Sequence, residues 1–104
     1  MAFVDNRRLY TFTGASNGTW FPAQNYEIAY TLHFVGSGAG DTCEVRVSNA
    51  VAQPADASHE SLFGAAVATD QAMVSVDKPF QWMKVRKTAH TQTTTVDICA
   101  QIRR

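Results

Sequence analysis

Residues 26–35 read Tyr-Glu-Ile-Ala-Tyr-Thr-Leu-His-Phe-Val. Every even-numbered residue in this stretch is large and apolar, whereas the odd-numbered residues are smaller or more polar. A period of two over ten residues predicts a β-strand with one face in a core and the other face nearer to solvent. A one-residue slip would turn the whole apolar face to water, so the register of this strand is well specified.

The same alternation recurs along the chain. Further strands are predicted at residues 9–13, 42–48, 72–76, 80–88 and 93–102. The glycine-rich stretch 36–41 and the polar stretch 89–92 each separate two strands, which predicts two β-hairpins. Asn17-Gly18 predicts a turn, and Pro22 predicts an edge segment or corner. Residues 61–69 fit a short helical turn or a strand, and Gly64 together with the surrounding pattern favours the strand.

These strands predict an all-β fold, namely a single small antiparallel β-sandwich or jelly-roll-like barrel. With 104 residues the chain forms one domain. We expect an extended N-terminal arm at 1–8, a β-sandwich core at 9–102 and a C-terminal tail at 103–104.

The composition is globular, with 45% hydrophobic and 17% charged residues and a formal net charge of zero. A neutral chain has no global field to attract nucleic acid or an acidic membrane. Residues 1–8 contain no apolar h-region, and no apolar run approaches the roughly 20 residues that span a bilayer. We therefore expect no nucleic-acid or membrane partner, and synthesis in the cytosol.

Strand parity places the two cysteines on opposite faces. Cys43 shares parity with Val45 and Val47 and is expected in the core, whereas Cys99 opposes Val96 and Ile98 and is expected to face outward. This argues against an intrachain disulfide and predicts two free thiols. An intersubunit contact through Cys99 is the alternative.

The chain shows no catalytic motif. It has no Gly-x-Ser-x-Gly elbow, and His33, His59 and His90 have no metal-ligand spacing. The glycines at 36–40 lack the Lys-Ser/Thr ending of a phosphate-binding loop. We expect no enzyme activity, no catalytic residues, no metal and no cofactor.

Trp82, Lys84 and Arg86 share one strand face, an arrangement that can stack nucleic-acid bases. The simpler reading is that Trp82 packs under a neighbouring loop while the cations are solvated, and the zero net charge favours it. Carbohydrate binding through Trp20, Phe21 or Trp82 also remains open.

Three segments together carry a family resemblance. They are Thr-Trp-Phe-Pro-Ala-Gln-Asn-Tyr (19–26), Cys-Glu-Val-Arg-Val-Ser-Asn (43–49), and Pro-Phe-Gln-Trp-Met-Lys-Val-Arg-Lys-Thr with Thr-Thr-Thr-Val-Asp-Ile (79–98). The chain resembles small β-sandwich virion proteins of tailed bacteriophages. These include decoration or cement proteins, which bind the outside of the capsid and are often trimers, and some tail and fibre-associated modules.

The resemblance implies a non-enzymatic structural protein of the virion, made in the cytoplasm of a bacterial host. A capsid decoration protein that stabilises the outer shell is the first interpretation. Its partners would be the major capsid protein or other virion proteins, and further copies of itself, a trimer being implied. The alternatives are a tail, neck or fibre-associated module, and a carbohydrate- or receptor-binding β-sandwich.

Two segments lack a core-facing pattern yet carry groups able to bind, namely the N-terminal arm and the loop 49–60. We hypothesise that they contact neighbouring chains. The side chains that we expect at protein interfaces are aromatic or basic: Phe3, Arg7, Arg8, Trp82, Lys84, Arg86, Arg103 and Arg104.

Overall fold

The computed structural model describes residues 3–23, 30–36, 38–55 and 60–102, with the backbone alone at 3–5 and 101–102. Within this part of the chain all regular structure is β. The strands are β1 (Phe3–Phe12), β2 (Ser16–Asn17), β3 (Phe21–Pro22), β4 (Tyr30–Val35), β5 (Thr42–Ser48), β6 (Ser61–Leu62), β7 (Ala72–Val76), β8 (Trp82–Ala89) and β9 (Thr94–Ile102).

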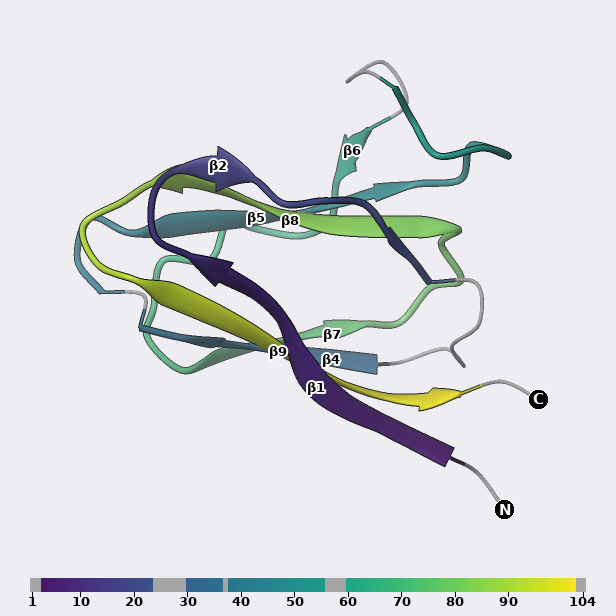
Figure 1. The fold of residues 1–104 in the computed structure, drawn as a ribbon, viewed down its shortest axis with the longest axis horizontal. Helices are drawn as coiled ribbons and strands as arrows, with labels where there is room; N and C mark the ends of the chain where they lie inside the picture. Colours follow the sequence, from purple (N-terminus) through teal and green to yellow (C-terminus); the bar gives the residue numbers. More distant parts are fainter. Residues whose placement is uncertain (1–2, 24–29, 37, 56–59, 103–104) are drawn as a thin grey trace.

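The strands form two antiparallel sheets that pack face to face (Figure 1). We call them sheet A, with the order β1-β9-β4-β7, and sheet B, in which β2 and β3 border β8, followed by β5 and β6. The predicted all-β class and the antiparallel sandwich are therefore confirmed.

The core lies between the sheets and follows the predicted alternation. Tyr30, Leu32 and Phe34 of β4 are buried against residues of β5, β8 and β9. The first four residues of the predicted strand, 26–29, lie outside the described part. Cys43 is buried, Cys99 is exposed and both thiols are free, as parity predicts.

Both predicted hairpins are wrong. The segment 36–41 carries the chain from β4 in sheet A to β5 in sheet B, and the segment 90–93 carries it from β8 in sheet B back to β9 in sheet A. Two strands that face each other across a core show the same alternation as two strands paired in one sheet. The sequence pattern therefore identifies the inward face of each strand but not the sheet to which the strand belongs.

A buried ion pair ties these two crossovers together. Asp41 Oδ1 accepts hydrogen bonds from the backbone N–H groups of Thr91 (2.7 Å) and Gln92 (3.1 Å) and lies 3.0 Å from Lys87 Nζ. The side chains of Asp41 and Lys87 are fully buried. Lys87 Nζ also donates to the carbonyl of Gln92 (2.6 Å) and to Thr94 Oγ1 (2.8 Å). This network satisfies the two charges that the core encloses.

The prediction of an N-terminal arm is also wrong, because residues 3–8 belong to β1. They pair with residues 97–102 of β9, and a bulge lies between Arg8 and Tyr10. Figure 1 shows β1 lying along β9 at the edge of sheet A. An edge strand is held by its backbone ladder, so a polar sequence without apolar alternation still forms it. The last two predicted core residues, 101–102, end β9, and the tail 103–104 lies outside the described part.

Of the remaining local predictions, two are confirmed and one is wrong. Phe21–Pro22 pairs with β8 at the edge of sheet B, as Pro22 predicts. Residues 61–69 contain β6 and an isolated bridge from Val67 to Cys43, so the strand interpretation holds in two short pieces. Asn17-Gly18 is not a turn, because Asn17 pairs with Arg86 and the N–H of Gly18 donates to the carbonyl of Val85 (2.8 Å).

Candidate functional site

The outer face of sheet B carries three of the predicted interface residues, all on β8. Its two central strands, β5 and β8, pair in register: Glu44 faces Arg86, the two cations Arg46 and Lys84 face each other, and Ser48 faces Trp82. Like charges in directly opposed positions destabilise a strand pair, so an anion beside Arg46 and Lys84 stabilises this arrangement. The predicted shared face of Trp82, Lys84 and Arg86 is therefore confirmed.

Lys84 is not solvated, contrary to the expectation. It is 7% exposed although it lies on the outer face of its sheet. Its Nζ atom lies 3.0 Å from Glu60 Oε2 and 4.6 Å from the ring centroid of Trp20. The Trp20 ring and the Glu60 carboxylate thus cover the ammonium group, and a cation over an indole face is attracted by the ring quadrupole.

Glu60 connects this contact to β5. Its Oε1 atom lies 3.6 Å from Arg46 Nε, and Arg46 Nη2 lies 2.8 Å from Glu44 Oε1. The side chain of Glu60 is 7% exposed, so a carboxylate shared by two cations is held nearly out of solvent. The network fixes Glu60, which directly precedes β6, against the face of sheet B.

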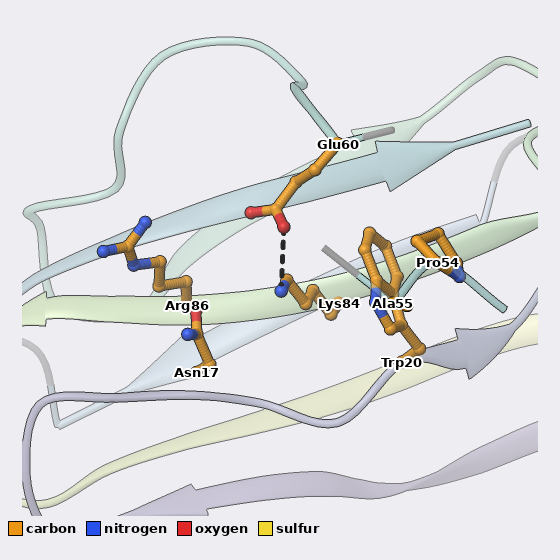
Figure 2. A pocket seen from close by; sticks show the side chains of 7 residues that line it. All are labelled: Asn17, Trp20, Pro54, Ala55, Glu60, Lys84 and Arg86. Carbon is orange, nitrogen blue, oxygen red and sulfur yellow. Dashed lines mark ion pairs between the residues drawn. The ribbon is translucent and has the colours of Figure 1, made fainter. Parts of the chain in front are cut away.

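A pocket of about 200 Å³ opens beside this network. Figure 2 shows Glu60 and Lys84 pointing toward each other, with the Trp20 ring between Lys84 and Pro54. Asn17 and Arg86 complete the lining at the other end. Small-molecule sites are usually about 300–1,000 Å³, so this volume suits one inserted side chain better than a whole ligand.

Arg86 supplies the accessible charge of the pocket. Its side chain is exposed, and within the described part of the chain no ion pair includes it. With Asn17 beside it, the pocket offers a guanidinium and an amide to an acceptor group. A carboxylate is the group that a guanidinium binds best, because two parallel N–H donors match its two oxygens.

The indole N–H of Trp82 is hydrogen-bonded within its own chain. Its Nε1 atom donates to the carbonyl of Ala50 at 3.1 Å, and the side chain is half-buried under the loop after β5. The interpretation in which Trp82 packs under a neighbouring loop is confirmed.

The other predicted interface residues lie away from the pocket. Arg8 Nε lies 2.9 Å from Asp97 Oδ1, on the outer face of sheet A. Arg7 Cζ lies 5.0 Å from the ring centroid of Phe21, where the edges of the two sheets approach each other. Phe3 contributes its backbone to β1, its side chain being outside the described part. Arg103 and Arg104 also lie outside it.

The other residues that line the pocket are only weakly indicated by the sequence. Glu60, Pro54 and Ala55 come from an irregular segment without periodicity, so nothing in the pattern places them over sheet B. Trp20 stands before an edge proline, which is the one signal that it borders β8. The described residues of the predicted loop 49–60, namely 49–55 and 60, do border this pocket through Pro54, Ala55 and Glu60.

The described residues contain neither a metal-binding cluster nor a membrane-spanning helix. No three His, Cys, Asp or Glu side chains are grouped so that they could hold a metal ion. No helix there is both long enough and apolar enough to cross a membrane.

The sequence matches no protein-family model and no curated protein. The fold is similar to the crystal structure of SPBc2 prophage-derived protein YomS, with a TM-score of 0.74. The similarity covers 97% of this chain and 95% of that chain, at 10% sequence identity. The two chains therefore share a fold over nearly their whole lengths.

Proposed function

We propose that this chain is a non-enzymatic structural protein of a bacteriophage particle, namely a decoration protein that binds and stabilises the outer capsid shell. The observation that carries the proposal is the fold shared with a prophage-derived protein across almost the entire length of both chains. The three sequence segments that resemble virion proteins point in the same direction.

The pocket on sheet B supports a protein partner over a sugar. Carbohydrate sites commonly use an open aromatic face, but Lys84 lies over the ring of Trp20, the aromatic residue that lines this pocket. The exposed Arg86 and Asn17 at a small opening suit an acidic side chain of a neighbouring virion protein. Many such contacts across a symmetric shell add up through multivalency, so each one can be weak.

The test is co-sedimentation of the purified chain with DNA-filled heads that lack tails, and separately with isolated tails, from the phage that encodes it. Binding to heads is expected. Binding to tails alone would move the assignment to a tail, neck or fibre module, and binding to neither would contradict a virion role. Glycan-array binding that is lost on Trp20→Ala would instead favour the carbohydrate-binding alternative.

A variant pair tests the pocket itself. Arg86→Glu should reduce binding to heads, because it replaces the accessible cation with an anion. Thr13→Glu, a charge change at an exposed bend outside the pocket, is the matched control and should bind like the unaltered chain. Equal binding by both variants would show that the contact lies elsewhere on the molecule.

A further inference from the structure

Asn17 is the only asparagine of the chain that precedes a glycine. Asparagine is chemically labile, and a following glycine increases this lability, because no Cβ atom hinders the attack of the glycine nitrogen on the side chain. In this reaction Gly18 N gives up its proton and bonds to Asn17 Cγ, the Cγ–Nδ2 bond breaks, and ammonia leaves with the proton. One water molecule then opens the succinimide ring at either carbonyl, which leaves aspartate or isoaspartate at position 17.

The backbone of β2 withholds Gly18 N from this attack. Asn17 is exposed to water, yet its backbone is that of an extended strand and pairs with Arg86 of β8. The N–H of Gly18 donates to the carbonyl of Val85 (2.8 Å). Ring closure needs a nitrogen that has lost its proton and a backbone that bends toward the side chain. Neither is available while β2 is paired with β8.

The hold on β2 is weak. The strand has two residues and lies at the edge of sheet B. Tyr10 of β1 adds one contact, because its hydroxyl donates to the carbonyl of Thr19 (2.6 Å). Short edge elements open locally at a free-energy cost well below that of global unfolding. The folded state should therefore slow the reaction without abolishing it.

Packing requires the glycine of this pair, whereas the asparagine borders a site. A Cβ atom at position 18 would collide with the carbonyl oxygen of Val85. Asn17 and Arg86 together line the pocket described above and a second one of about 230 Å³ that extends to Thr88. A chemical change at Asn17 therefore acts on both pockets.

We propose that Asn17 is a site of slow spontaneous deamidation, restrained by the pairing of β2 with β8, and that the product neutralises Arg86. Position 17 lies directly opposite Arg86 in the register of these strands. A carboxylate there faces the guanidinium, and opposite charges in such positions attract. Isoaspartate also adds a methylene to the backbone, which shifts the register of β2. As the protein ages, this reaction removes the accessible charge that the two pockets share.

Peptide mass spectrometry tests the restraint on the purified chain, incubated at mildly alkaline pH either folded or in guanidinium chloride. Conversion of Asn17 should be at least about tenfold slower in the folded chain, because only its opened fraction reacts. Tyr10→Phe removes the hydroxyl that holds Thr19 and should speed the reaction of the folded chain about threefold. Thr13→Ala in the preceding bend is the control and should leave the rate unchanged. Equal rates in both states, a folded chain that never converts, or a Tyr10→Phe variant that reacts like the control would overturn the proposal.

Arginine labelling with phenylglyoxal tests the effect on Arg86. Asn17→Asp reproduces the aspartate product and should slow the labelling of Arg86, whereas Asn17→Ser, which stays neutral, should not. Arg8, which is already paired with Asp97 on sheet A, provides the internal reference in each sample. Equal labelling of Arg86 in the two variants would overturn the neutralisation. Neither measurement involves a partner, so failure of the head-binding test would leave both results standing, and the reverse also holds.

Discussion

At the scale of single residues, Lys87 carries a charge into the core. It shares parity with Met83 and Val85, which are buried, so the pattern of β8 already places it on the inner face. What the sequence does not provide is its partner, because Asp41 belongs to a glycine-rich segment with no periodicity. The pair forms only when two crossovers between the sheets come together.

Lys87→Met should lower the free energy of unfolding by about 3 kcal/mol, because it leaves the Asp41 carboxylate buried without its cation. Arg86→Met is the matched control on the same strand. Arg86 is exposed, so this change should stay within about 0.5 kcal/mol. Urea denaturation of both variants measures the difference, and equal stability would show that the buried pair does not hold the crossovers.

The stability of the protein should fall in acid because of Asp41. Burial opposes ionisation of this carboxyl, but hydrogen bonds from Thr91, Gln92 and Lys87 outweigh it and hold its pKa well below the usual range. In the unfolded chain the pKa of an aspartate is about 4. A pKa that is lower in the folded state stabilises the fold above pH 4 and loses that effect as the pH falls further.

Unfolding measured from pH 7 down to acid should therefore show a steep loss of stability below about pH 4. In Asp41→Asn the slope over the same pH range should be shallower, although the variant is less stable throughout. An unchanged slope in this variant would mean that other carboxyl groups dominate the acid transition.

At the scale of elements, close approach between strands governs Gly18. Its φ is negative, so a left-handed backbone is not the reason for glycine here. A Cβ atom at this position would collide with the carbonyl oxygen of Val85 and lie 2.7 Å from Tyr10 Cε1. The Asn17-Gly18 pair thus serves the approach of β2 to β8, and a motif typical of turns is misleading in this position.

Gly18→Ala should destabilise the protein by about 2 kcal/mol through overpacking. Gly14→Ala is the matched control in the preceding bend, where an added Cβ meets no atom within 4 Å. That change should be neutral or slightly stabilising, since it restricts the unfolded chain. Thermal unfolding compares the two, and an equal effect of both changes would argue against close packing at Gly18.

Removal of residues 1–8 tests whether this segment acts as a free arm, as predicted, or as part of strand β1. The deletion takes away the pairing of residues 3–8 with β9, so the free energy of unfolding should fall by about 3 kcal/mol or more. Removal of residues 1–2 alone should have little effect, because β1 begins at Phe3. If the longer deletion left chemical denaturation unchanged, residues 3–8 would act as an arm after all.

At the scale of the whole molecule, the sequence was sufficient for the fold class and for the inward face of most strands. The alternation of Tyr30, Leu32 and Phe34, and of Val96 and Ile98, agrees with their burial. The sequence could not assign each strand to a sheet, because strands paired within one sheet and strands packed face to face show the same alternation. The pocket could not be predicted from the sequence either, since the positions of Glu60 and Pro54 depend on the assembled sheet B.

The proposed function makes this chain a structural component of a phage particle. A cryo-electron microscopy reconstruction of the intact particle of the encoding phage tests it most directly. Density that fits this two-sheet sandwich is expected at repeated positions on the outer surface of the head. A complete reconstruction of head and tail without such density would contradict it.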